Sequence, residues 1–290
     1  FGDLVFVCNS GAEANEAAIK LARKYSVEQH GERRTDVITA LSSFHGRTLG
    51  GISATGQDKV RLGFGPVVPG FHYVCAIMLE PVQGEGGVNI PSPGYLRAVR
   101  ELCDAHDLLL IFDEVQVGCG RTGSLFAYQQ EDVEPDLMTL AKALAGGPPI
   151  GAMICREQHA GALGPGTHGS TFGGNPLMTA TALAAMDVYL QGDVLNNCRE
   201  MGQYLLNQLD ALKSRYNFIA DVRGRGLILG LELTIEGGEI VKTALQRGLL
   251  INCTVGKVLR FVPPLTVTKE EIDQMLEILT GIFDEYQEQT

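Results

Sequence analysis

The sequence contains no tryptophan, no CxxC pair and no apolar run long enough to span a membrane. Because a transmembrane helix needs about 20 consecutive apolar residues, no membrane span is predicted. The seven cysteines are scattered and no Cys/His cluster accompanies them, which argues against a disulfide framework and against a metal site. Scattered cysteines of this kind are typical of a reducing compartment, so we expect a cytoplasmic protein.

Basic residues are also scarce, since 23 Lys and Arg against 34 Asp and Glu give a formal net charge of −11. This surplus of negative charge disfavours non-specific binding to nucleic acid or to anionic membranes. What the sequence does contain is 36 glycines in a chain that is 45% hydrophobic. Such a composition is typical of a globular protein in which helices and strands are joined by tight loops.

Short apolar runs alternate with segments of helical periodicity over residues 1–195. The runs over 76–80 and 108–113 predict buried parallel strands, with a helix over 94–106 between them. The other elements predicted in this part are strands over 4–8, 36–41, 137–141 and 151–155 and a helix over 11–25. This order predicts an α/β fold with a mostly parallel central sheet and helices on both faces. Residues 196–290 predict a smaller C-terminal α+β domain.

Two segments carry a capping box, in which a Ser or Thr and a Glu three residues later open a helix. Ser10 and Glu13 predict the start of the first helix, and Thr268 and Glu271 predict the start of the last one. The two small residues between Ser10 and Glu13 would let an anion such as phosphate approach the free N–H groups of the first turn. The alternative is a capped helix start without a ligand.

Two charged residues follow apolar strands, where α/β proteins commonly bind ligands. Asp113 ends the strand over 108–113, and a carboxylate in that position needs a cationic partner. Lys142 follows the strand over 137–141 between apolar neighbours, so desolvation favours the neutral amine that a Schiff base requires. The alternatives are an aspartate that pairs with an arginine or a backbone turn, and a lysine at the surface.

Three further segments allow more than one interpretation. Phe44 can stack on a planar ring, and Arg47 can bind a carboxylate. Arg223 and Arg225, at the start of a strand, are two more candidates for a carboxylate. The segment GCGRTG over 118–123 has the glycine pattern of dinucleotide sites, but no helix start follows it, which argues against nucleotide binding.

Seven motifs occur in a fixed order along nearly the whole chain: SGAE, FHGRT, EPVQGEGG, DEVQ, TLAKAL, STFGGNP and VRGRG. This series resembles the class-III aminotransferases, which have fold type I of the enzymes that depend on pyridoxal 5'-phosphate (PLP). The resemblance implies PLP as cofactor, and it implies transfer of the ω-amino group of N-acetylornithine to 2-oxoglutarate. Another ω-amino substrate on the same scaffold stays open. An oxidoreductase built on GCGRTG is the alternative from a different class.

The resemblance implies nine cofactor-binding residues, namely Gly11, Ala12, Phe44, Asp113, Glu114, Val115, Gln116, Lys142 and Thr171. Lys142 is implied to bind the cofactor covalently and to move the substrate proton, and Asp113 to pair with the pyridinium nitrogen. Gln116 is implied to contact the ring oxygen. Thr171 is implied to reach the cofactor of a neighbouring subunit, so the resemblance also implies a homodimer.

Four residues are implied to contact the substrates. Arg47 and Ser170 are expected to contact N-acetylornithine, and Arg223 is expected to bind the α-carboxylate of glutamate or 2-oxoglutarate. Glu85 is expected to pair with Arg223 when the other substrate is bound, which would let one pocket accept two different acids.

The resemblance further predicts that parts of the family's chain are missing. Family members begin well before Phe1, with a segment that contributes substrate contacts and dimer surface. Residues 70–74 also run almost directly into the strand near 76–80, although a crossover between parallel strands needs about a dozen residues. We therefore expect absent residues between about 72 and 76, near the join of residues 74 and 75.

Overall fold

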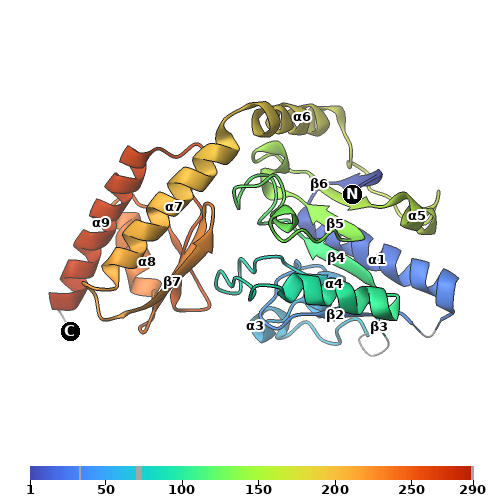
Figure 1. Ribbon diagram of the computed structural model, residues 1–290. Coiled ribbons are helices and arrows are strands. Elements are labelled where there is room, and N and C mark those ends of the chain that lie inside the picture. The colour runs from blue at the N-terminus through green and yellow to red at the C-terminus, as the bar shows by residue number, and fades with distance from the viewer. Residues whose placement is uncertain (33, 70–73, 289–290) are drawn as a thin grey trace.

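Two β-sheets, one of six strands and one of four, organise the molecule (Figure 1). The computed structural model describes residues 1–32, 34–69 and 74–288. The larger sheet has the order β1-β6-β5-β4-β3-β2. Its strands are β1 (Leu4–Cys8), β2 (Asp36–Thr39), β3 (Val74–Leu79), β4 (Leu109–Asp113), β5 (Leu137–Leu140) and β6 (Gly151–Cys155). Strands β2 to β5 run parallel and β6 runs antiparallel to both of its neighbours, which confirms a mostly parallel α/β sheet.

Helices cover both faces of this sheet, with α1 on one face and α4 on the other (Figure 1). The helices and 3-10 turns of this part are α1 (Gly11–His30), α2 (Leu49–Ala54), α3 (Asp58–Arg61), α4 (Tyr95–His106), α5 (Glu157–Ala160), η1 (Ala127–Gln130), η2 (Lys142–Ala145) and η3 (Gly161–Leu163). The first helix runs past its predicted end at residue 25 to His30, and Gly31 follows with a φ of 81°. A glycine in the left-handed region is a common helix stop, which explains the boundary.

The side chains of the central strands alternate between two apolar clusters. In β4, Leu109 and Ile111 pack in the cluster on the α1 side, whereas Leu110 and Phe112 pack in the cluster on the α4 side. Successive side chains of a strand point to opposite faces, so an uninterrupted apolar run indicates burial on both faces. The same alternation directs Asp113, the last residue of β4, towards the α1 side.

The smaller sheet lies in the C-terminal part of the chain, at the left of Figure 1, and all its strand pairs are antiparallel. Its order is β7-β8-β10-β9. The elements of this part are α6 (Pro176–Gln191), α7 (Val194–Leu212), β7 (Ile219–Arg225), β8 (Ile228–Leu233), α8 (Gly238–Gln246), β9 (Asn252–Thr254), β10 (Val258–Phe261) and α9 (Lys269–Glu288). The predicted capping box of the last helix is present, because Glu271 N donates to Thr268 Oγ1 at 3.3 Å and Thr268 N donates to Glu271 Oε2 at 2.8 Å.

The segment over 118–123 joins the two parts of the chain. It forms turns rather than the start of a helix, as its sequence predicts. Arg121 Nη1 donates to Leu227 O at 2.9 Å and to Pro263 O at 2.6 Å, both in the C-terminal part. A glycine of this segment also serves the contact between the two parts, because an added Cβ on Gly120 would lie 3.1 Å from Leu265 Cδ1.

Two expectations about the chain stay predictions. A domain boundary at residues 195 and 196 would fall at the beginning of α7, and we keep it as a proposal. The expected loss of residues between 72 and 76 falls largely outside the described residues, since 70–73 are not among them.

Candidate active site

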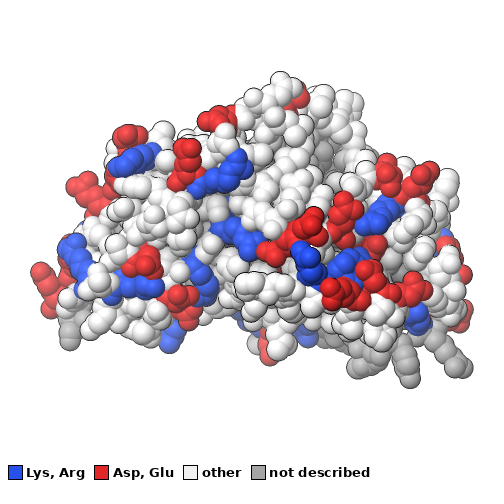
Figure 2. Space-filling view, in the orientation of Figure 1, with Lys and Arg blue, Asp and Glu red and all other residues white. Residues whose placement is uncertain are grey.

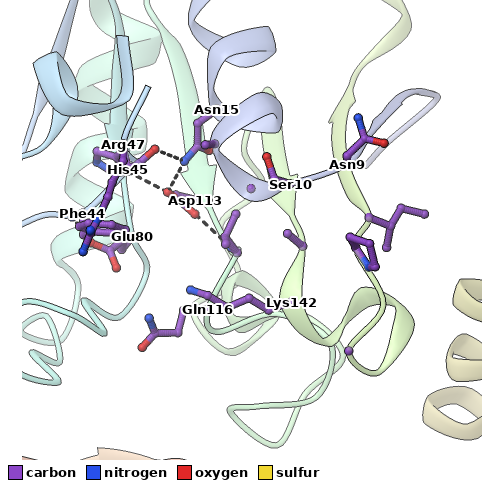
Figure 3. A pocket seen from close by; sticks show the side chains of 18 of the residues that line it. Asn9, Ser10, Asn15, Phe44, His45, Arg47, Glu80, Asp113, Gln116 and Lys142 are labelled. Atoms are coloured by element: carbon purple, nitrogen blue, oxygen red, sulfur yellow. Dashed lines mark hydrogen bonds and ion pairs between the residues drawn. The ribbon is translucent and has the colours of Figure 1, made fainter. Parts of the chain in front are cut away.

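A cavity of about 440 Å³ opens where the carboxyl ends of β4 and β5 meet the N-terminus of α1 (Figure 3). Sheets of parallel strands with helices on both faces bind their ligands at this edge. Eight of the predicted site residues line the cavity, namely Gly11, Ala12, Phe44, Arg47, Asp113, Val115, Gln116 and Lys142. The fold thus brings together segments that lie far apart in the sequence.

The N-terminus of α1 presents two free N–H groups to this cavity. Ser10 caps the helix, because its Oγ accepts from the N–H of Glu13 at 3.3 Å. The described residues provide no acceptor for the N–H groups of Gly11 and Ala12. Unpaired donors at the positive end of a helix dipole attract an anion such as phosphate. Gly11 is also required sterically, since an added Cβ would lie 2.6 Å from Val115 Cγ1.

Asp113 lies in the wall of the cavity and is held by three donors. Its Oδ2 accepts from Asn15 Nδ2 and contacts His45 Nδ1, both at 2.8 Å, and its Oδ1 accepts from Val115 N at 3.0 Å (Figure 3). Burial alone would raise the pKa of Asp113, but these hydrogen bonds and the charge of His45 lower it below its usual value. Among the described residues no Arg or Lys forms a salt bridge with this carboxylate. A cationic group inside the cavity would balance its charge.

Lys142 is the first residue of η2, one residue beyond the position that follows β5, and its side chain extends into the same cavity (Figure 3). Burial lowers the pKa of Lys142, and the negative charges of Asp113 and Glu80 oppose this shift only in part. Its backbone has a φ of 47°, a left-handed conformation that costs energy for any residue with a side chain. The described residues form no hydrogen bond with Nζ, so this amine is free to act on a ligand.

Glu80 and Arg47 place an acidic and a basic side chain in the cavity wall. Glu80 accepts from Phe44 N at 2.9 Å and from Gly84 N at 3.1 Å. Burial raises the pKa of Glu80 to about 7, although the positive charge of His45 acts against the rise. Arg47 is exposed at the cavity and has no hydrogen bond or ion pair with the described part of the chain. It is therefore free to bind a carboxylate.

Arg260 reaches the site from β10 of the smaller sheet, and no sequence motif had identified it. Its Nη1 donates to Glu85 Oε2 at 3.0 Å and to Gln116 Oε1 at 2.9 Å. The Arg260 side chain is only 10% exposed, so its charge is shielded from bulk water. The charges of Arg260 and Glu85 both act on the pKa of Lys142, and they act in opposite directions. The smaller sheet thus adds a paired guanidinium close to the amine.

The pairing of Glu85 with Arg223, expected when the other substrate is bound, stays a prediction, and in this structure the two side chains have other partners. Arg223 Nε donates to Val88 O at 3.0 Å and its Nη2 donates to Gly87 O at 2.7 Å, while its Nη1 pairs with two carboxylates of its own sheet. Every nitrogen of the Arg223 guanidinium is therefore engaged. Glu85 pairs with Arg260 instead, because the loop that carries Glu85 lies between the two arginines.

Arg225, the neighbouring candidate for a carboxylate, is also engaged. Its Nη1 donates to Glu131 Oε1 at 2.8 Å, which joins β7 to the turn after η1. Glu114 does not line the cavity either. It is buried and accepts from the backbone N–H groups of Ala127 and Tyr128 at 2.7 and 2.8 Å, so it anchors the η1 segment.

Ser170 and Thr171 lie outside the cavity that contains Lys142. They line a separate hollow beside α1, where Ser170 Oγ accepts from Asn9 Nδ2 at 3.0 Å. A single chain therefore does not bring these two hydroxyl groups to Lys142.

Asn15, His45 and Glu80 belong to the site although the sequence did not identify them as site residues. Asn15 is a buried amide within the alanine-rich face of α1, and that interruption of an apolar face is a usable signal. Arg260 offers a similar signal, as a charge within a short strand whose other residues are apolar. Each signal is weak alone, since a buried polar group can be satisfied in many ways.

Comparison with known proteins agrees with this geometry. The family model Aminotransferase class-III matches residues 1–75 and 72–283. Acetylornithine aminotransferases of Caldanaerobacter subterraneus and Methanocaldococcus jannaschii are both 49% identical to this chain over 98% of its length, and the matched parts are 77% and 75% of those proteins. The chain belongs to the class-III aminotransferases, and its cofactor is accordingly PLP.

Solved structures show the same fold. The ornithine aminotransferase of Toxoplasma gondii superposes with a TM-score of 0.95 at 36% identity, over 100% of this chain and 74% of that one. The N-acetylornithine aminotransferase of Stenotrophomonas maltophilia superposes with a TM-score of 0.83 at 38% identity, over 100% and 77% of the two chains. These neighbours confirm fold type I of the PLP-dependent enzymes.

The described residues contain neither a membrane-spanning helix nor a cluster of metal ligands. None of their helices combines the length and apolar character needed to cross a membrane. In the same part of the chain, no three His, Cys, Asp or Glu side chains are placed to hold a metal ion.

Proposed function

We propose that the protein transfers the ω-amino group of N-acetylornithine to 2-oxoglutarate, which gives N-acetylglutamate semialdehyde and glutamate in arginine biosynthesis. Relatives at 49% identity carry the matching name, and so does one of the structural neighbours. One observation carries the proposal from the structure. An unpaired arginine, Arg47, lines the cavity of Lys142, and a second arginine, Arg260, contacts Gln116 at the edge of this cavity and is covered by Glu85.

The residues of the cavity fit the functional groups of PLP. The free N–H groups of Gly11 and Ala12 would hold the phosphate, and the ionised Asp113 would pair with the pyridinium nitrogen. Phe44 and Val115 would contact the two faces of the ring. When bound, PLP supplies an electron-withdrawing ring that stabilises negative charge on the substrate carbon next to the transferred nitrogen.

Lys142 is the residue that we assign to covalent attachment and to proton transfer. Its lowered pKa raises the fraction of neutral amine, which can accept a proton from the substrate carbon. Its unusual backbone conformation fixes the point from which the side chain enters the cavity. Gln116 supports the site by accepting from Arg260 with its Oε1, which leaves its amide N–H groups to donate to the ring oxygen.

Two arginines allow one cavity to accept two different acids. Acetylornithine carries its carboxylate far from the reacting ω-carbon, whereas glutamate carries a second carboxylate directly on the reacting carbon. Arg47 suits the distant carboxylate of either substrate, and Arg260 suits the carboxylate on the reacting carbon of glutamate. When acetylornithine is bound, Glu85 neutralises Arg260, as in this structure, because a shielded charge without a partner is costly.

A homodimer would complete the site. Thr171 and Ser170 lie away from Lys142 of their own chain, beside the start of α6. Figure 2 shows few charged side chains over α6. The exposed apolar residues of this helix include Leu177, Leu183 and Leu190. A helix that is apolar on most sides needs to be covered. We infer that a second copy covers it and receives Thr171 at its cofactor.

The seven cysteines bear on the compartment. All of them are free in the structure, and six are buried. Free buried thiols suit a reducing environment, so we infer a cytoplasmic enzyme.

Comparison of four amino donors tests the proposed substrate. The enzyme with PLP would be assayed with acetylornithine, ornithine, succinylornithine and 4-aminobutyrate, with 2-oxoglutarate as acceptor. We expect the highest kcat/KM with acetylornithine. Negligible turnover of acetylornithine with high turnover of another donor would overturn the substrate while leaving the aminotransferase class intact.

A further inference from the structure

The loop over residues 84–88, which carries Glu85, is held by the smaller sheet. Arg223 of β7 donates to two successive carbonyl groups of this loop, Gly87 O at 2.7 Å and Val88 O at 3.0 Å. The guanidinium is itself fixed, because its third nitrogen pairs with Asp221 and with a glutamate on the next strand. A planar fork with all its nitrogens engaged holds the loop at a defined distance from the sheet.

The register of the smaller sheet explains how the loop lies. Arg223 pairs with Gly230 across β7 and β8, and Gly230 pairs with Arg260 across β8 and β10. Residues opposite one another share a face of a sheet, so the two arginines flank the glycine on one face. A Cβ on Gly230 would lie 3.0 Å from Val88 Cβ, so the missing side chain makes room for Val88. The loop therefore crosses the sheet between the two arginines.

The backbone of this loop is strained next to Glu85. Val88 has a φ of 53°, although its side chain is β-branched, and this side chain is fully buried. A β-branched residue in the left-handed region is rare and persists only where surrounding contacts hold it. The base of the loop is closed by the bridge between Gln83 and Asn89, and its far side is held by Arg223. Arg223 thus acts at the point where the backbone is under strain.

We propose that Arg223 is a positioning residue that determines how firmly Glu85 covers Arg260, and hence how the enzyme discriminates between acetylornithine and glutamate. This inference rests on the proposed function. Arg260 belongs to the smaller sheet, and Arg223 ties the loop of Glu85 to that same sheet. The smaller sheet therefore holds both Arg260 and the loop of Glu85. Loss of the hydrogen bonds from Arg223 to this loop would let Glu85 move away from Arg260.

The test compares Arg223→Gln with the wild type and with Arg225→Gln, a matched change on the same strand whose partner is Glu131. With Glu85 held less firmly, Arg260 is more open to carboxylates and is less often neutralised for acetylornithine. We expect the ratio of kcat/KM for acetylornithine to that for glutamate to fall about tenfold in Arg223→Gln. Arg225→Gln should leave this ratio unchanged.

Binding of glutarate, a dicarboxylate that has no amino group to transfer, gives a readout that needs no turnover. Calorimetry on the holoenzyme should show tighter binding to Arg223→Gln than to the wild type, by a factor similar to the change in the ratio. In a Glu85→Gln background, Arg223→Gln should change neither quantity more than about twofold, since the coupled residue is gone. If Arg223→Gln does not fold, Arg223→Lys keeps the charge but loses the fork of donors, and it should show the same direction.

The possible outcomes separate the two proposals. Equal losses for both substrates with unchanged glutarate affinity would make Arg223 merely structural. If Arg223→Gln lowers the kcat/KM ratio just as much in the Glu85→Gln background, Arg223 acts on the substrate without Glu85, and the proposal is overturned. If the wild type does not use acetylornithine, the proposed function fails, while the glutarate affinities still decide the role of Arg223.

Discussion

Asp113 and Asp136 each contact a buried histidine, and they lie at opposite edges of the larger sheet, at the ends of two neighbouring parallel strands. Asp113 ends β4 and lies 2.8 Å from His45 Nδ1, whereas Asp136 precedes β5 and lies 3.5 Å from His159 Nε2. Both histidines are nearly inaccessible to solvent. The two pairs therefore share residue types and burial, and their functions have to be distinguished by what surrounds them.

The surroundings differ in their cations. Asp136 Oδ2 accepts from Arg100 Nη1 and from Leu110 N, both at 2.8 Å. Burial alone would raise the pKa of Asp136, but His159, Leu110 and Arg100 lower it to about 2. Asp113 has no arginine partner among the described residues and faces a cavity that contains a lysine. An aspartate–histidine pair thus has a structural role where an arginine also pairs with the aspartate, and it is a candidate chemical site where the aspartate faces a cavity that can hold a cationic ligand.

Lys142→Ala should cause the largest loss of turnover, and it changes only the site around Asp113 and not the one around Asp136. Loss of the amine removes both covalent attachment and proton transfer, so turnover should fall by roughly 10⁴-fold or more. Urea unfolding should be nearly unchanged. Steady-state assays would check this, with Lys59→Ala, an exposed lysine of α3, as the control. Turnover within tenfold of the wild type would refute the role of Lys142.

Asp113→Asn should lower turnover by about 10³-fold, because a neutral amide cannot hold a positive charge on the ring nitrogen. The amide keeps the shape of the side chain, so the fold should persist. Turnover and the absorption spectrum of the bound cofactor would be measured together. Normal turnover in Asp113→Asn would mean that Asp113, like Asp136, has only a structural role.

Asp136→Asn should affect stability instead of chemistry. Removing the charge leaves the partly buried Arg100 with only the exposed Asp104 as an ion-pair partner, which should cost about 2 kcal/mol in the free energy of unfolding. Turnover per folded molecule should stay within about twofold of the wild type. Urea titration and active-site titration would give the two numbers, and a large fall in kcat would break the proposed distinction.

The contribution of Asp136 should also depend on pH. Its pKa is about 2 in the folded protein and 3.8 in the unfolded reference, so the folded state favours the ionised form. The stabilisation is complete above about pH 4 and is lost as the pH falls towards 2, and it amounts to roughly 2 kcal/mol. The stability difference between the wild type and Asp136→Asn should therefore shrink below pH 4. A difference that stays constant down to pH 2 would contradict this assignment.

Much of the fold was predictable because local patterns determine it. The boundaries of β1 and β6 agree with their predictions, and Ser10 and Thr268 cap their helices as expected. Strand β9 was not predicted, since three residues are too few to show a period. The α1 boundary was missed because helical periodicity fades before a stop at glycine.

The sequence by itself determined which residues end the strands and open the first helix, and hence that Asp113, Lys142 and Gly11 share one edge of the sheet. Only the tertiary structure decided which arginine faces Glu85. Arg260 lies 175 residues from Glu85 along the chain, and Arg223 occupies the same row of the smaller sheet. Each of the two arginines lies within a strand of the smaller sheet, so neither local sequence shows which one meets Glu85. The path of the loop over Gly230 separates them, and that path depends on packing between distant segments.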